Sequence, residues 1–209
     1  MNELAVLIPL VIVASLLSIS LEWRLALGSL WAVHLLVGAW LALVATPELA
    51  LAKAITGTTI CALLWPSLRA LFGSGYEARQ RARQVLHLSG PRSTEETFML
   101  FGALLAAAAA VALSQAYPLV EGASNFAWYW LGLLGLLLVV LSRDVVRVGL
   151  GLLLLVNAVD LFDTMVARNQ DLFAIGARSV VAIALALALG LSWTYLQARG
   201  SRYLDGEAR

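Results

Sequence analysis

The chain has 209 residues, 61% of them hydrophobic and only 13% charged, and its formal net charge is +1. A soluble domain is nearer half apolar and a quarter charged, so this composition predicts an integral membrane protein. The basic residues are dispersed, which gives no indication of a nucleic-acid partner. The single cysteine, Cys61, excludes a disulfide framework and a cysteine-rich metal site, and His34 and His87 lie too far apart for zinc-ligand spacing.

Seven apolar segments follow one another, and each is close to the ~20 residues that a membrane-spanning helix needs. They cover residues 3–20, 25–44, 48–72, 96–116, 126–142, 147–166 and 172–195. Glu3 stands where a signal peptide carries a basic residue, so the first segment is expected to be a permanent helix. The prediction is an all-α, polytopic membrane protein with about seven transmembrane helices.

The domain organisation follows from these segments. A single transmembrane domain is expected, in which two three-helix units flank a connector helix and a cytoplasmic loop. The units span about 1–72 and 126–195, the loop 73–95, the connector 96–116 and a cytoplasmic tail 196–209. The arginines Arg79, Arg81 and Arg83 of the loop suit either anionic lipid head groups or a topology anchor.

The placement of basic residues predicts which side of the membrane each end faces. With the N-terminus outside, only Lys53, Arg168 and Arg178 of the 14 basic residues fall toward the outer side. Cytoplasmic segments carry an excess of lysine and arginine, so the expected orientation is N-out and C-in.

The two predicted units resemble each other when the chain is shifted by 123 residues. "RLALGSLWAVH" (24–34) then aligns with "RVGLGLLLLVN" (147–157), so that Arg24 meets Arg147 and His34 meets Asn157. Because the aligned segments lie four helices apart, in the second and the sixth, the repeat would be parallel, in a 3+1+3 arrangement. Parallel repeats are one known way of building membrane transport proteins.

A polar stripe interrupts the sixth apolar segment. Asn157, Asp160 and Asp163 are spaced by three residues and therefore share one helix face. A charged residue at the centre of a membrane helix costs about 2.5–3.5 kcal/mol, so such residues usually have a function. Arg178 lies about six residues, or about 9 Å, into the next helix, at the depth of Asp160. We therefore expect an Asp160–Arg178 ion pair, with Asp163 as the alternative acid.

Two interpretations of this polar axis are open. In one, the ion pair and Asn157 fasten helices together. In the other, the carboxylates pass protons or sodium ions along a hydrated half-channel. His34 lies at mid-membrane depth and suits either a proton relay or a simple hydrogen bond inside the bundle. Lys53 is expected to reach the outer interface near Glu48 and to serve a structural role.

Several segments resemble a known family. "SRDVVRVGLGLLLLVNAVDLF" (142–162) resembles the second helix of subunit K of NADH–quinone oxidoreductase and of the C subunits of multi-subunit cation/proton antiporters. In length and duplication the chain is more similar to membrane component E of the hydrogenase-4 and formate hydrogenlyase family. The segments "WRLALGSLWAVH", "PEL", "TTICALLWP" and "LFAIGARSVVAIALAL" also resemble that family.

The charged positions of that family are changed in this chain. At two positions where the relatives carry buried acids, this chain has Leu153 and Val156, and a third family acid would fall near Val180. Cys61 stands where the family has a lysine. The nearest charges are Asp160, Asp163 and Lys53. What the resemblance implies is assembly into a complex-I-like membrane arm more than direct ion conduction.

The functional hypothesis is a non-catalytic accessory subunit of an energy-converting assembly in a bacterial-type cytoplasmic (inner) membrane. It would contact other membrane subunits and lipids, carry no cofactor, and support proton or sodium translocation coupled to redox chemistry in its partners. Asp160, Asp163, Asn157, His34, Arg178 and Lys53 would line or brace the polar axis. The sequence has no motif typical of catalytic or metal sites. The alternatives are a free-standing small-solute transporter of 3+1+3 layout and a structural membrane scaffold.

Overall fold

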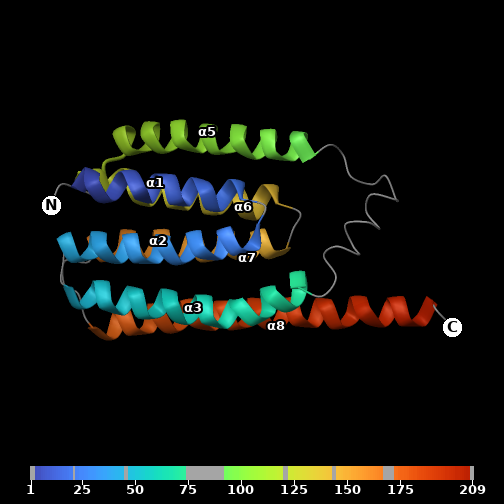
Figure 1. The fold of residues 1–209 in the computed structure, drawn as a ribbon. Helices are drawn as coiled ribbons and strands as arrows, with labels where there is room; N and C mark the ends of the chain where they lie inside the picture. Colours follow the sequence, from blue (N-terminus) through green and yellow to red (C-terminus); the bar gives the residue numbers. More distant parts are fainter. Residues whose placement is uncertain are drawn as a thin grey trace.

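A computed structural model describes residues 3–20, 22–44, 47–73, 92–119, 122–142, 145–166 and 172–207. These residues form an all-α bundle of seven long helices (Figure 1). The helices are α1 (Glu3–Ile19), α2 (Trp23–Val44), α3 (Pro47–Gly73), α5 (Arg92–Ala116), α6 (Ala123–Leu141), α7 (Val145–Val166) and α8 (Leu172–Glu207). Helix and span boundaries agree to within a few residues for most elements, because long apolar runs are the strongest sequence signal.

Six of these helices, α2, α3, α5, α6, α7 and α8, are long and apolar enough to cross a membrane. The chain is therefore a multi-pass membrane protein. The first helix is shorter, with 17 residues, and Pro9 lies within it. It nevertheless runs alongside the others in the bundle (Figure 1).

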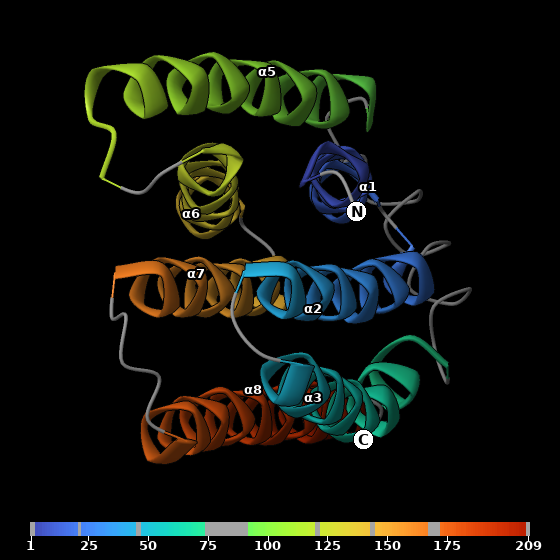
Figure 2. The same cartoon turned by 90° about the vertical axis from the view of Figure 1, so that its left-hand side faces the viewer.

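The helices are arranged as two stacks (Figure 2). One stack contains α1, α2 and α3 in that order, and the other contains α6, α7 and α8. Each helix contacts its counterpart in the other stack, in the pairs α1 with α6, α2 with α7 and α3 with α8. The remaining helix, α5, packs on α6 and α1 at one end of the two stacks, as a connector between the units would.

The stacks reproduce the repeat seen in the sequence. A shift of 123 residues carries each helix of the first stack onto its counterpart within about three residues at its start. Two pairs of equivalent residues also touch across the stacks. His34 contacts Asn157, and a Cβ placed on Gly190 would lie 3.1 Å from the Ser67 Oγ. The 3+1+3 arrangement is thus a property of the fold.

Glycines allow the closest helix contact in the second stack. A Cβ on Gly135 of α6 would lie 2.8 Å from the carbonyl oxygen of Gly151 of α7, and a Cβ on Gly151 would lie equally close to that of Gly135. Gly149 is packed under Trp193 of α8 in a similar way. Small residues of this kind let the backbones of membrane helices approach each other.

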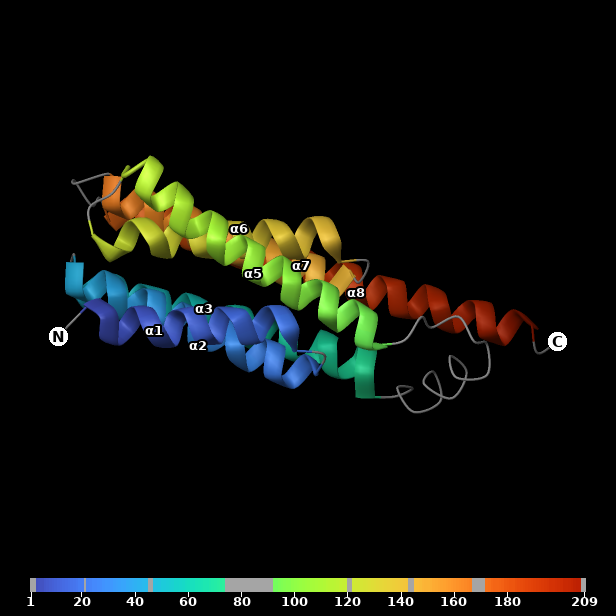
Figure 3. The same cartoon turned by 90° about the horizontal axis from the view of Figure 1, so that it is seen from above.

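The C-terminal segment, for which a tail at 196–209 is expected, is helical as far as Glu207. Helix α8 continues for 36 residues to Glu207 and projects beyond the other helices (Figure 3). At 1.5 Å per residue it is about 54 Å long, well beyond the ~30 Å hydrocarbon core. Most of the predicted loop 73–95, with Arg79, Arg81 and Arg83, lies outside the described residues, and α5 begins at Arg92, before the expected residue 96. The N-out orientation stays a prediction.

Candidate functional site

The six polar residues singled out in the sequence meet in one connected chain. They come from four helices: His34 from α2, Lys53 from α3, Asn157, Asp160 and Asp163 from α7, and Arg178 from α8. We call this set the polar chain. It links the two stacks, because its members on α2 and α3 contact its members on α7.

Asn157 joins the histidine to the lysine. Its side-chain oxygen accepts a hydrogen bond from the Lys53 Nζ at 3.0 Å. Because an ammonium only donates, this contact fixes the orientation of the amide. The amide nitrogen then donates to the carbonyl oxygen of Leu153 at 3.0 Å and faces the His34 Nε2 at 3.2 Å. His34 Nε2 is therefore the acceptor, and any proton of a neutral imidazole is on Nδ1.

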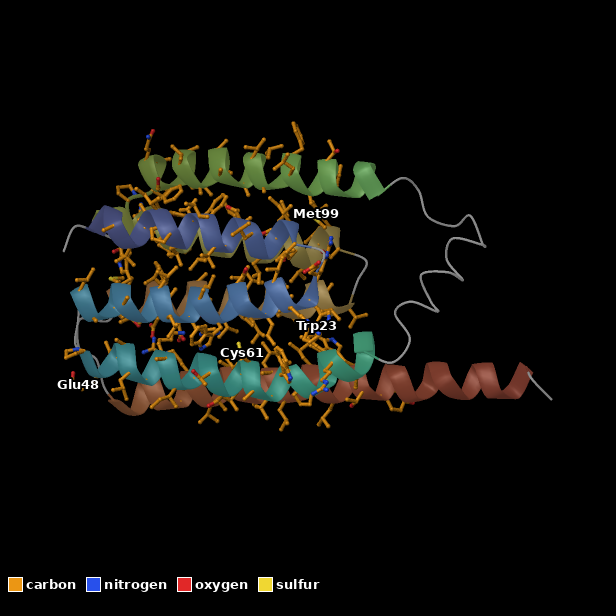
Figure 4. All side chains as sticks on the ribbon, in the orientation of Figure 1. Trp23, Glu48, Cys61 and Met99 are labelled. Carbon is orange, nitrogen blue, oxygen red and sulfur yellow. The ribbon has the colours of Figure 1, made fainter. Side chains whose placement is uncertain are left out.

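Lys53 does not reach the outer interface, and that expectation is wrong. Glu48 lies at the end of α3 (Figure 4), whereas Lys53 points into the bundle and forms an ion pair with Asp160 of α7. Only 6% of the lysine side chain and 10% of the aspartate side chain are exposed. A desolvated ammonium is stable only beside a counter-charge, which Asp160 supplies.

Arg178 interacts with both aspartates. Its Nε lies 3.5 Å from the Asp160 Oδ1, and its Nη1 donates to the Asp163 Oδ2. The expected Asp160–Arg178 pair is therefore confirmed, and the alternative Asp163–Arg178 pair is present as well. Asp160 also accepts from Lys53 and is thus shared between two cations from different stacks.

The charges of the polar chain balance, and the exposure of its side chains rises from one end to the other. Two cations and two carboxylates balance, so the ionised cluster has no net charge. Exposure rises from 0% at Asn157 to side-chain values of 10% at Asp160, 22% at Arg178 and 52% at Asp163. The polar chain is therefore closed at His34 and opens at Asp163, toward the end of the bundle that holds the N-terminus.

An apolar layer lies beyond His34. One turn from His34 and Asn157 along their helices, toward the predicted inner side, are Leu30 and Leu153, and Ile60 and Leu64 follow on α3; all four are buried. The His34 Nδ1 is buried and has no hydrogen-bond partner among the described residues. The polar chain thus ends in the middle of the bundle.

Two glycines of the first stack make room for the polar chain, and the sequence reasoning missed both. A Cβ on Gly57 would lie 2.5 Å from the His34 Cβ and 2.9 Å from its Cγ. A Cβ on Gly38 would lie 3.2 Å from the Lys53 Cβ. The available signal was a glycine four residues after each polar residue on the same helix, Gly38 after His34 and Gly57 after Lys53.

No described group of three or more His, Cys, Asp or Glu side chains could hold a metal ion. Cys61 lies in the middle of α3 (Figure 4), with its Sγ 3.7 Å from the carbonyl oxygen of Leu27. What the polar chain can do chemically is store, exchange or stabilise charge inside the bundle.

Comparison with known proteins adds no further constraint. No family model matches the chain, and no curated protein or solved structure is significantly similar to it. The resemblance to complex-I-like subunits therefore stays a prediction, and the functional argument depends on the geometry of the polar chain.

Proposed function

We propose that the chain is a membrane-arm subunit of a complex-I-like or energy-converting-hydrogenase-like assembly. It would lie in a cytoplasmic membrane of bacterial type and support proton or sodium movement coupled to redox chemistry in partner subunits. The observation that supports this proposal is the polar chain from His34 to Asp163, with its buried Lys53–Asp160 pair. Ionisable groups linked inside a membrane bundle are typical of ion pathways.

The shape of the polar chain favours an accessory role over an independent pump. It occupies one half of the bundle and ends at His34 against the apolar layer. A complete pathway would need another polar segment to reach the opposite surface. We infer that neighbouring subunits supply that segment, and the redox chemistry as well.

The first test is the state of the protein in its native membrane. After extraction in mild detergent, a native gel followed by mass spectrometry should show the chain in a large assembly with antiporter-like and quinone- or hydrogenase-type subunits. A lone monomer or homo-oligomer would contradict the accessory role.

The second test asks whether the charges serve ion movement. Asp160→Asn keeps the shape of the side chain and removes its charge, and ion pumping by the purified assembly should fall at least tenfold. Ser192→Ala is a suitable control, because the Ser192 hydroxyl is exposed and, among the described residues, bonds only to the carbonyl oxygen of Leu189 in its own helix. Full pumping by the Asp160→Asn assembly would instead favour the structural-scaffold alternative.

A free-standing transporter is the second candidate, and the 3+1+3 layout is the observation that favours it. Small sugar facilitators share this layout but bend at prolines within several helices, whereas in the described helices the internal prolines are Pro9 and Pro66. At the contact between α2 and α7, His34 and Asn157 are bonded to each other. Solute uptake by the chain alone in proteoliposomes would support this candidate.

A further inference from the structure

The side chain of Asn157 links the two stacks at the closed end of the polar chain. It lies between Lys53 of α3 and His34 of α2, and it is fully buried. Its amide hydrogens are directed to the carbonyl oxygen of Leu153 and to the His34 Nε2, and its amide oxygen accepts from the Lys53 Nζ. The amide is therefore held at three contacts.

The opposite orientation of this amide is unfavourable at the contacts with Lys53 and Leu153. If its oxygen and nitrogen exchanged places, the NH2 group would face the Lys53 ammonium, which has no lone pair to accept a hydrogen bond. The amide oxygen would face the carbonyl oxygen of Leu153, which only accepts. Leaving buried donors and acceptors unpaired is costly. The orientation is therefore fixed while Lys53 is paired with Asp160.

An amide held in this way interrupts proton transfer between Lys53 and His34. To pass a proton along, the amide oxygen would take one from the Lys53 Nζ while the amide nitrogen gave one to the His34 Nε2. The lysine would become neutral, the imidazole would become charged, and the Asn157 side chain would be left as its imidic acid. An amide is not among the side chains that titrate in proteins, so this route is closed near neutral pH.

The second nitrogen of His34 offers no route onward. A relay takes up a proton at one ring nitrogen and releases one from the other. Because Nε2 accepts from Asn157, Nδ1 carries the proton of the neutral ring, and no described polar atom accepts it. A Cβ on Gly57 would lie 2.9 Å from the His34 Cγ, so α3 packs directly against the base of the ring. The imidazole is thus held between an amide on one side and apolar packing on the other.

We propose that Asn157 is a positioning residue that ends proton exchange at Lys53 and holds His34 as a neutral hydrogen-bond acceptor. Protons that enter the polar chain at Asp163 are exchanged as far as the Lys53–Asp160 pair and no farther. His34 orients the amide and is not a proton carrier. The inference rests on the proposed function, because it defines which part of the polar chain exchanges charge.

The position of the proton on His34 tests the inference directly. The chain has two histidines, so the His87→Gln variant retains His34 alone. Nitrogen NMR of this full-length variant, isotope-labelled at histidine in lipid bilayers at neutral pH, should show a neutral ring with its proton on Nδ1. When Asn157→Asp is added, the bridging side chain has no N–H, and Nε2 should become protonated. An imidazolium or an Nε2 proton before that change, or an unchanged ring after it, would overturn the inference.

Two substitutions of His34 test the same point in the purified assembly. His34→Gln offers a side-chain oxygen to the Asn157 amide but takes up no proton, whereas His34→Leu leaves an amide hydrogen without an acceptor. Ion movement should fall at least about fivefold in His34→Leu, because the amide that positions Lys53 is no longer held, and His34→Gln should restore most of it. Equal losses in both variants would make His34 a proton carrier and overturn the inference.

Failure of the proposed function would be recognised separately. An assembly in which Asp160→Asn leaves ion movement intact would contradict the proposed function, whatever the state of His34. An assembly that loses ion movement in Asp160→Asn, and equally in both His34 variants, would leave the proposed function standing and overturn only the role given to Asn157. The NMR measurement needs no partner subunit and decides where the His34 proton lies in either case.

Discussion

The two helix stacks share one layout but differ in chemistry. The second stack carries Asn157, Asp160, Asp163 and Arg178, and the equivalent positions in the first stack hold His34, Val37, Trp40 and Ile55. Val37 and Trp40 are fully buried, as is most of Asp160. The same layout is therefore built with and without the carboxylates.

The difference indicates that the charges are not needed for the fold as such. Val37 occupies in the first stack the position that Asp160 has in the second. Replacing buried ion pairs by apolar residues is often neutral or stabilising. Burying the acids thus costs free energy, and packing alone does not require them. This is the reason to ascribe a function to them. The following variants test this comparison.

The largest effect is expected from Asp160→Ala. This change leaves Lys53 buried without its counter-charge and removes one of the two acids beside Arg178. Breaking a buried pair from one side costs about 3–5 kcal/mol. Detergent thermal unfolding should show a large fall in melting temperature, and an unchanged melting temperature would mean that Lys53 reaches solvent.

Gly151→Ala should have a smaller but clear effect. Its new methyl group would meet the Gly135 carbonyl oxygen at 2.8 Å and force α6 and α7 apart. We expect a loss of about 1–3 kcal/mol, by the same unfolding assay. The equivalent Gly28→Ala in the first stack is the control, because beyond its own turn of helix no described atom lies within 4 Å of such a methyl group. Equal losses in both variants would contradict the difference in packing.

Trp40→Phe tests the position equivalent to Asp163. The Trp40 Nε1 donates to the Ser124 Oγ of α6 at 2.9 Å, and both residues are buried. Loss of this bond should cost about 1–2 kcal/mol. Trp31→Phe is a matched control, since the Trp31 Nε1 bonds Thr58 at an exposed site and its loss should be nearly neutral.

The smallest net change in stability is expected from the double variant Lys53→Met/Asp160→Val, in which position 160 receives the valine of its first-stack equivalent, Val37. Both charges of the buried pair are removed together, and Arg178 keeps Asp163. Stability should stay within about 1–2 kcal/mol of the parent, while ion movement by the assembly is lost. A double variant as unstable as Asp160→Ala would mean that the pair mainly holds the stacks together.

The sequence predicted the helices and the Asp160–Arg178 pair well, and the physical reasons are clear. Apolar length defines a membrane helix, and residues three apart on one helix must share a face. Matching depths on adjacent helices then brought Asp160 and Arg178 together. The alignment of His34 with Asn157 also pointed to residues that turned out to touch.

The position of Lys53 was not predictable by the same reasoning. Distance along α3 places it near an interface, but which way it points depends on where α7 packs, and α3 and α7 are far apart in sequence. The contact requires the two stacks to be aligned face to face, with Gly38 and Gly57 providing the space. Such information is not contained in any single helix.

The apolar layer beyond His34 has an electrical consequence. A membrane potential falls mainly where the dielectric constant is low, and so across the layer that contains Leu30, Ile60, Leu64 and Leu153. Moving one elementary charge through a potential of 100 mV involves about 2.3 kcal/mol. A charge that crosses this apolar layer would therefore do electrical work that depends on the membrane potential.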